Sequence, residues 1–325
     1  MEQPLVIVST SPHVRSPRTT RGVMLDVCAA LLPALAASVW HFGARAFLLA
    51  LVSVGSCVAF EALSRIVMKR PQSVGDCSAI VTGLLLAFNL PPALPLWMVP
   101  IGALVAIVIV KQLFGGIGQN FANPAITARI VLLLSFPAAM TGWSAPCGVD
   151  AIASATPLKV LGEVLASRPS DFSPGDFPSL LQMLLGQRGG SLGETCAAAL
   201  LLGGLYLCIR KVITPLIPLC YIGVVALCSF FYTGSPVLML YELLGGGLLL
   251  GAVFMATDYS TSPVTRWGKV IFAVGCGLLT CLIRFFGNMP EGVSFAILLM
   301  NLLSPHIENL TAPKAFGKEK RHAKA

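Results

Sequence analysis

Long apolar stretches alternate with short polar breaks along almost the whole chain. A helix that crosses a bilayer needs roughly 20 apolar residues, and shorter or broken helices are tolerated where protein shields the backbone. By this rule the pattern predicts about ten membrane-spanning helices. They are expected at residues 24–41, 47–67, 78–90, 95–114, 124–140, 195–209, 213–232, 237–256, 270–286 and 292–307.

A polar stretch divides these helices into two groups of five. Residues 141–194 carry several charges, prolines and glycines, so we expect an exposed loop or small cap there. The predicted organisation follows directly from this division. It consists of an N-terminal tail (1–21), a first transmembrane repeat (22–140), the polar loop (141–194), a second transmembrane repeat (195–307) and a basic tail (308–325).

Composition supports the same class. Hydrophobic residues make up 56% of the chain and charged residues only 11%, which is incompatible with an ordinary water-soluble surface. The mean hydropathy is +0.83. We therefore predict an all-α polytopic membrane protein with broken or short helices and one outer polar loop.

The two halves share short sequence similarities. Residues 82–88, TGLLLAF, resemble GGLLLGA at 246–252, and LFG at 113–115 resembles FFG at 285–287. Because each half has an odd number of spans, the second would enter the membrane in the opposite sense, as an inverted repeat. Such folds place functional groups where broken helices meet, here at the breaks 89–92 and 257–263. Convergence of apolar, low-complexity sequence is the alternative explanation.

Positive charge predicts the orientation. With the N-terminus inside, most of the 22 lysines and arginines fall in inner segments, as cytoplasmic loops prefer. Both termini are then cytoplasmic and the polar loop lies outside. Basic residues facing anionic lipid account for the net charge of +8, so no nucleic-acid partner is predicted. The first 21 residues lack the pattern of a cleavable signal peptide, which favours a cytoplasmic tail.

No motif predicts a bound metal. The ten cysteines include no Cys-x-x-Cys pair, and the four histidines are dispersed. Buried structural thiols are the interpretation we favour for the cysteines. A transient sodium ion is the one metal that we expect.

Several ionisable residues lie in or at the ends of predicted spans, where such groups are costly and usually paired or functional. They are Asp26, Glu61, Arg129, Glu242, Asp258 and Arg284. Asp258 is the strongest candidate for contact with an ion or a flavin, because it falls at a break on the inner side, and Asn89 at the other break is a weaker one. Arg129 either holds a flavin phosphate or pairs with a carboxylate, and the sequence does not decide between them.

The linker GGIGQN at 115–120 is glycine-rich. A run of this kind can form a backbone nest for a phosphate. It follows a transmembrane helix, however, and lacks the strand and helix of a nucleotide-binding motif, so a simple turn between helices is the interpretation we favour.

Longer motifs carry a family resemblance. They are KQLFGGIGQN at 111–120 with NPA at 123–125, DAIASATPL at 150–158, ATD at 256–258, and EGVSFA at 291–296 with LMNL at 299–302. Together they resemble the RnfD component of Rnf electron-transport complexes and, more distantly, the NqrB component of the sodium-pumping NADH:quinone reductase. The similarity extends from about residue 21 to residue 316.

The resemblance implies redox-driven ion transport. An Rnf complex moves electrons between ferredoxin and NAD, coupled to sodium or proton translocation across the inner membrane of a bacterial or archaeal cell. This chain would be one subunit among other Rnf subunits and would not catalyse the reaction alone. The family further implies a second, non-covalent flavin such as riboflavin held among the helices, for which the sequence names no residues.

The resemblance also implies a covalent flavin. In this family FMN is joined through its phosphate to a threonine in an Asp-x-x-[Ser/Thr]-Gly-Ala-Thr type motif on the outer side, by a separate flavin transferase. Asp150, Ser154, Ala155 and Thr156 fall at that spacing, so Thr156 is the expected attachment residue. Ala153 replaces the usual Ser or Thr, and Ser154 replaces the usual Gly.

Residue chemistry agrees with this assignment. A threonine hydroxyl forms a phosphoester once a transferase with a bound divalent metal removes its proton. Pro157 biases Thr156 towards an extended backbone, which exposes the hydroxyl.

Two other functions compete with the redox role. Inverted repeats of five spans also build channels and solute transporters, and a fold does not fix a function. A structural membrane subunit with a decayed flavin site is the third possibility, to which the changes at Ala153 and Ser154 point.

Overall fold

The fold was analysed in a computed structural model, which describes residues 18–143, 179–186, 189–287 and 292–313. Regular structure in these ranges is entirely helical. The first half comprises α1 (Thr20–Phe42), α2 (Ala44–Val67), η1 (Val74–Asp76), α3 (Ser78–Phe88), α4 (Met98–Leu104), the π-helix η2 (Val105–Gln112), α5 (Pro124–Ser135) and α6 (Pro137–Met140). The short helix α8 (Leu180–Leu185) comes next. The second half comprises α9 (Ala197–Ile209), α10 (Leu216–Thr233), α11 (Pro236–Leu244), α12 (Leu248–Leu250), the π-helix η5 (Gly251–Met255), α13 (Arg266–Phe286) and α14 (Gly292–Thr311).

Five of these helices are long and apolar enough to cross a membrane alone: α1, α2, α10, α13 and α14. A sixth span results if α11 and the segment Leu248–Met255 count as one bent span. The other apolar helices, α3, α4 with η2, α5 and α9, are shorter. The predicted class of helical, multi-pass membrane protein is therefore confirmed, and every predicted span contains a helix. Ten complete spans stay a prediction.

Two predicted helices are broken. Residues 124–140 form α5 and α6, because Phe136 before Pro137 leaves the helical conformation, with φ −134° and ψ 59°. Residues 237–256 bend by 64° at the Gly245–Gly247 break between α11 and α12. The prediction of broken or short helices is thus confirmed.

Close approach between helices depends on small residues. A Cβ on Gly83 of α3 would lie 2.7 Å from the Val54 backbone of α2, and one on Gly203 of α9 would overlap the Ala30 carbonyl oxygen of α1. Ser53 donates a hydrogen bond of 2.7 Å to the Gly83 carbonyl across the α2/α3 contact. Lipid is as apolar as leucine, so this close packing and these hydrogen bonds hold the helices together.

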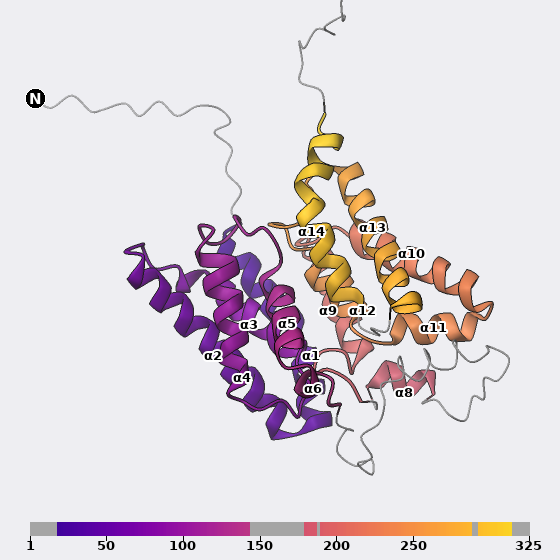
Figure 1. Cartoon of the computed structure of the whole chain (residues 1–325), viewed down its shortest axis with the longest axis horizontal. Helices are drawn as coiled ribbons and strands as arrows, with labels where there is room; N and C mark the ends of the chain where they lie inside the picture. The colour runs from indigo at the N-terminus through magenta and orange to yellow at the C-terminus, as the bar shows by residue number, and fades with distance from the viewer. Residues whose placement is uncertain (1–17, 144–178, 187–188, 288–291, 314–325) are drawn as a thin grey trace, which may run out of the picture.

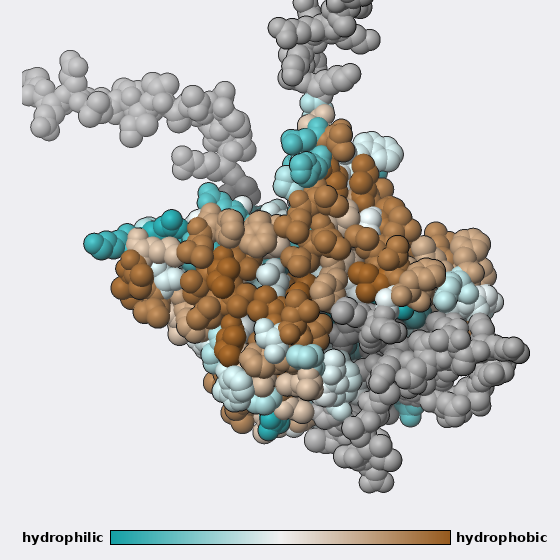
Figure 2. Space-filling model, viewed as in Figure 1, coloured by the Kyte–Doolittle hydropathy of each residue, from teal (hydrophilic) through white to brown (hydrophobic). Residues whose placement is uncertain are grey.

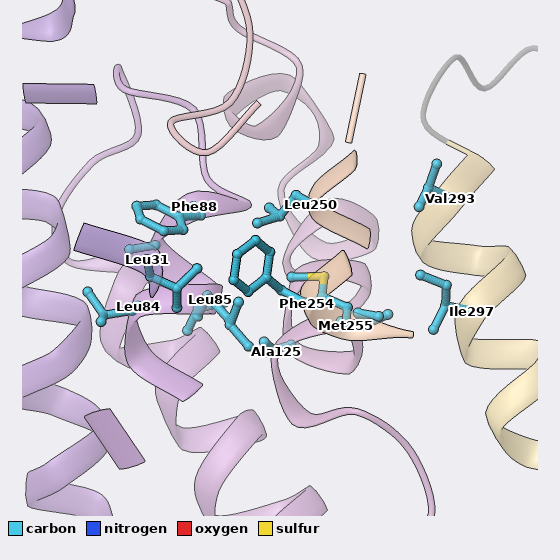
Figure 3. Close-up of a cluster of buried hydrophobic side chains, with 14 of the residues drawn as sticks. Leu31, Leu84, Leu85, Phe88, Ala125, Leu250, Phe254, Met255, Val293 and Ile297 are labelled. Carbon is cyan, nitrogen blue, oxygen red and sulfur yellow. The ribbon is translucent and has the colours of Figure 1, made fainter. Parts of the chain in front are cut away.

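The two halves lie side by side and share one core. Figure 1 shows the helices of the first half on one side and those of the second half on the other. In Figure 3 the labelled side chains of the two halves approach one another, with Leu31, Leu85 and Phe88 from the first facing Leu250 and Phe254 from the second. The broken segment formed by α12 and η5 is therefore one of the parts of the second half that enter the common core.

The surface has the character expected of a bilayer protein. Figure 2 shows a broad band of hydrophobic side chains across the visible face, with hydrophilic residues gathered towards its ends. Large apolar side chains stand exposed on the long helices, among them Trp40 (84%), Phe231 (80%) and Phe286 (79%). Contiguous exposure of this kind marks a surface that lipid or partner proteins cover.

The last part of the predicted polar loop is buried. The sequence predicts an exposed segment up to Glu194, but residues 189–195 are buried against α3 and α12. The Leu192 and Gly193 N–H groups donate to the Leu90 and Phe88 carbonyls, which closes the end of α3. A Cβ on Gly193 would overlap the Phe88 side chain, so only glycine permits this approach.

Candidate functional site

A buried polar network lies at the contact of the two halves. Arg129, in the middle of α5, is 3% exposed. Its Nη1 donates to Asn89 Oδ1 (2.9 Å) and Ser294 Oγ (3.1 Å), and its Nη2 lies 3.6 Å from Glu194 Oε1. Asn89 in turn donates to the Leu85 carbonyl at 2.6 Å. We call Arg129, Asn89, Glu194 and Ser294 the central network.

A helix break from each half meets at this network. Asn89 terminates α3, while the Gly245–Gly247 break separates α11 from α12. A Cβ on Gly247 would lie 2.8 Å from Glu194 Oε1 and 3.6 Å from Arg129 Nη1. The Gly245–Gly247 break therefore reaches Glu194 and Arg129, while Asn89 contacts the Met255 sulfur (3.7 Å), just before the predicted break at 257–263. Residues 257–260 themselves line a cleft towards the start of α3.

Because the central network is buried, loss of any one charged partner is expected to be costly in free energy. Two charges removed from water repay their desolvation only with good geometry and further hydrogen bonds, and removal of one partner leaves the other charge buried alone. Asn89 and Ser294 supply the further bonds to Arg129. The network thus links α3, α5, α14 and the buried segment before α9.

Each half also contains a buried ion pair of its own. Lys111 Nζ lies 2.7 Å from Glu61 Oε2, joining η2 to α2, and also donates to Ser78 Oγ at 2.6 Å. Arg284 Nη1 lies 2.9 Å from Glu242 Oε2, joining α13 to α11. Lys111 and Arg284 are both buried within the helix packing.

An open cleft lies between the halves, away from the central network. Its wall includes the start of α1, the start of α3, the 117–125 linker, the end of α9 and the 257–260 turn. The polar residues that line it are Ser78, Thr82, Lys111, Asn120, Asn123, Thr257, Asp258, Tyr259 and Ser260. Apolar side chains such as Met24, Leu85 and Phe254 complete the wall. We call it the inner cleft, after the side of the membrane predicted for these chain segments.

Two residues of the inner cleft have incomplete partners. Asp258 accepts hydrogen bonds from the Ser260 N–H (3.3 Å) and hydroxyl (3.0 Å) and has no ion pair within the described ranges. Desolvation raises the pKa of Asp258 above its ordinary value, against the opposing effect of these hydrogen bonds. Asn120 Oδ1 is buried without a hydrogen-bond partner in the described part of the chain. An orphan acceptor beside a cleft is a position that a ligand donor can satisfy.

The predicted site residues fall into three places. Asp150, Ser154, Ala155 and Thr156 lie outside the described residues. Arg129 and Asn89 come together directly, and Asp258 lies apart from them in the inner cleft. Where the structure describes the chain, it contains no group of three or more His, Cys, Asp or Glu residues arranged for a metal.

Sequence reasoning missed Glu194 and Lys111. Glu194 belongs to the predicted polar loop, and Lys111 enters the sequence analysis only as the first residue of the 111–120 motif. The available signal was that a charged residue within a membrane usually has a partner of opposite charge. All the intramembrane ionisable residues singled out from the sequence except Asp258 form ion pairs, including Asp26 with Arg210 at 3.2 Å. A search for partners of the remaining charges would have led to these two residues.

Comparison with known proteins gives a consistent result over the full length. The model of the NQR2, RnfD, RnfE family matches residues 7–317. The D component of the Na(+)-translocating ferredoxin:NAD(+) oxidoreductase complex of Acetobacterium woodii is 45% identical over 324 residues, with 98% of both chains covered. The D component of the proton-translocating ferredoxin:NAD(+) oxidoreductase complex of Clostridium ljungdahlii is 43% identical, covering 95% of this chain and 96% of the relative. The D component of the ion-translocating oxidoreductase complex of Stutzerimonas stutzeri is 42% identical, covering 92% of each.

Proposed function

Because this chain belongs to the NQR2, RnfD, RnfE family, we propose that it is the flavin-carrying membrane subunit of an Rnf-type complex. Such a complex couples electron transfer between ferredoxin and NAD to sodium or proton translocation. The observation that carries the proposal is the similarity to components of two ferredoxin:NAD(+) oxidoreductase complexes over nearly the whole of each chain. The chain acts with other Rnf subunits and has no catalytic activity alone.

The proposed covalent cofactor is FMN on the Thr156 hydroxyl. Support comes from family membership and from the Asp150 to Thr156 spacing. FMN supplies reversible electron transfer when it is attached. Asp150, Ser154 and Ala155 provide the polar and small surroundings that a flavin transferase requires around the hydroxyl. Arg129 is not assigned a phosphate, since its nitrogens already contact Glu194, Asn89 and Ser294.

The inner cleft has the chemistry for the second, non-covalent flavin. An isoalloxazine ring has apolar faces and a polar edge, so its site needs apolar walls with a few polar groups. Leu85 and Phe254 provide apolar wall, and the orphan Asn120 Oδ1 provides an acceptor for a ring N–H. Asn123 is already occupied, because it caps α5 and donates to the Met255 carbonyl.

Ion coupling is proposed at Asp258. Reduction adds negative charge in a region of low dielectric, which favours uptake of a cation. Asp258 is a carboxylate on the wall of the inner cleft with no ion-pair partner among the described residues, so a sodium ion or a proton can neutralise it there. If ion transport stayed fully coupled to electron flow in Asp258→Asn, this role would be excluded.

Membrane topology forms part of the proposal. We assign the chain to the cell inner membrane with two inverted five-helix repeats, both termini inside and the Thr156 loop outside. The helix contacts support two equivalent repeats. The first helices of the two repeats, α1 and α9, pack on each other, and so do the last, α5 and α14. Within each repeat the second helix packs on the third and fourth: α2 on α3 and α4, and α10 on α11 and α13. Cysteine accessibility at residue 156 and at the tails would test the two sides.

The decisive experiment is in-gel flavin fluorescence on denatured protein expressed with its flavin transferase. We expect a fluorescent band for the native chain and for Thr141→Ala, a threonine at the start of the same loop, and none for Thr156→Ala. A fluorescent band for Thr156→Ala would show that the flavin is attached to a residue other than Thr156. Its absence from all three chains, with the transferase active on another target, would favour a channel, a solute transporter or a decayed subunit.

A further inference from the structure

A second group of polar side chains lies at the end of α2 and η2, outside the residues that line the inner cleft. Gln112 is fully buried, yet neither its Nε2 nor its Oε1 has a hydrogen-bond partner in the described ranges. An unpartnered buried amide is costly, so a native protein that keeps one calls for an explanation. Gln112 lies next to Lys111 in sequence but takes no part in the Glu61 pair.

Arg65 reaches the same space. Its Nη2 lies 2.6 Å, and Gln112 Oε1 4.0 Å, from the point where a Cβ on Gly116 would stand. The Arg65 side chain makes no hydrogen bond or ion pair with any described residue, and its Nε is buried. Glu61, one helical turn earlier, is engaged by Lys111 and Ser73. A guanidinium and an amide thus converge on one point without a protein acceptor in the described part of the chain.

The glycine-rich linker lies beside the Arg65 and Gln112 side chains. Gly115, Gly116 and Gly118 have φ values of +125°, +107° and +86°, a backbone conformation that other residues rarely adopt. The absent side chain of Gly116 leaves the room that the Arg65 guanidinium fills. The linker joins η2 to α5, as expected of a turn between helices, and Gly116 also leaves space for the Arg65 guanidinium.

Charge and surface define the ligand. Arg70 donates to the Gln112 carbonyl at 3.3 Å and is exposed, as is Lys69, so the rim adds two more cations. Apolar side chains surround this basic rim: Ile66 is 64% exposed, Val67 73% and Phe114 51%. Cations beside exposed apolar helix faces suit an anionic headgroup with its acyl chains along the protein. Arginine also binds phosphate oxygens in a forked geometry that lysine lacks.

We propose that Arg65, Arg70, Gln112 and the Gly115–Gly118 turn form a binding site for the phosphate of an anionic phospholipid. The two arginines and the Gln112 amide donate to the phosphate oxygens. The acyl chains lie over the exposed outer faces of α2 and η2. This inference is independent of the flavin assignments.

Native mass spectrometry of the full chain in detergent tests the site, with dioleoyl phosphatidylglycerol as the probe and phosphatidylcholine as the neutral lipid. The wild type is expected to retain one phosphatidylglycerol, and Arg65→Gln to bind it at least tenfold more weakly. Arg266→Gln is the matched control, since Arg266 is an exposed arginine at the start of α13. Equal binding by Arg65→Gln and Arg266→Gln would overturn the proposal.

Two further arms separate other ligands from the lipid. Displacement of phosphatidylglycerol by inorganic phosphate at millimolar concentration would assign the site to soluble phosphate and overturn the proposal of a lipid site. Loss of partner subunits from Arg65→Gln, with lipid binding unchanged, would instead assign Arg65 to a carboxylate of another protein.

Gln112→Leu keeps the test valid if Arg65→Gln does not fold. Removal of an unpartnered buried amide should raise the melting temperature in lipid-free detergent. The same change should reduce the further rise that phosphatidylglycerol produces in the wild type, because a ligand stabilises only the state that binds it. A purely structural glutamine would show no such loss, and an unchanged lipid-dependent rise would contradict the site.

Discussion

Arg129 and Asp258 both lie between the two halves of the chain, but their neighbours differ. Around Arg129 the protein supplies a carboxylate, an amide oxygen and a hydroxyl, all from elements remote in sequence. Around Asp258 the described residues supply hydroxyl and N–H groups from Ser260 and Thr261 alone. One charge is neutralised by the fold, and the other is left open towards a cleft.

The difference separates two roles for charge in a membrane. A buried ion whose partners are all protein groups specifies how helices assemble, and disruption of it affects folding. A carboxylate or amide with incomplete partners beside a cleft contributes less to folding and can bind a ligand. The central network is therefore expected to govern stability, and the inner cleft is expected to govern cofactor and ion binding.

The largest effect is expected from Arg129→Met. It removes the ion pair between Arg129 and Glu194, and breaking a buried pair in this way costs about 3–5 kcal/mol. We expect a sharp fall in folded yield and in melting temperature, measured by tryptophan fluorescence in detergent.

A double variant tests the cause. Addition of Glu194→Gln to Arg129→Met removes the carboxylate that has lost its arginine and should restore most of the lost stability. If the double variant were as unstable as the single one, packing around Arg129 rather than charge would explain the loss.

A smaller effect is expected from Gly247→Ala at the α11/α12 break. The new Cβ would lie 2.8 Å from Glu194 Oε1, so the carboxylate must move away from Arg129. Overpacking of this kind costs about 1–3 kcal/mol. Gly223→Ala is the matched control, because a Cβ there meets nothing within 4 Å in the middle of α10, where alanine should stabilise the helix. Equal melting temperatures in both variants would contradict the close contact.

Much of the fold could be predicted from the sequence because apolar stretches mark helices directly. All ten predicted segments contain helices, and Pro137 and the glycines at 245–247 account for the breaks. The buried segment 189–195 was missed for a physical reason. Its glycines and its charge are typical of an exposed loop, and only the contacts of Leu192 and Gly193 with the end of α3 reveal that it is inserted.

The site could be predicted only in part. Position within a span identified Arg129, and position at a helix break identified Asn89 and Asp258. Which of them meet could not be inferred, since Arg129 and Glu194 are 65 residues apart in sequence (194 minus 129) and no local pattern relates them. Thr156 and its neighbours remain a prediction from the motif.

Two asparagines of the inner cleft should respond differently. Asn123 caps α5 through the N–H groups of Ala125 and Ile126 and also donates to Met255, so Asn123→Ala should cost about 1 kcal/mol or more. Asn120 Oδ1 has no partner among the described residues, so Asn120→Ala should change stability by less than about 0.5 kcal/mol. Asn120→Ala should nevertheless reduce non-covalent flavin content, measured by extraction from the purified chain. An unchanged flavin content in Asn120→Ala would show that Asn120 Oδ1 does not bind the flavin.

The smallest effect is expected at Asp258 and appears as a pH dependence. An unfolded aspartate has a pKa of about 3.9, and burial raises the pKa of Asp258 in the folded chain. Between these two values the folded chain binds more protons than the unfolded chain, so the contribution of Asp258 to stability falls as pH rises and is constant above the raised pKa. Asp258→Asn removes the titration, and its melting temperature should rise relative to the wild type as pH increases from about 4 to neutral. Sodium should narrow this difference near neutral pH if it binds the Asp258 carboxylate, because a bound cation offsets the cost of the charge. A melting temperature difference that does not depend on pH would show that folding does not shift the pKa of Asp258.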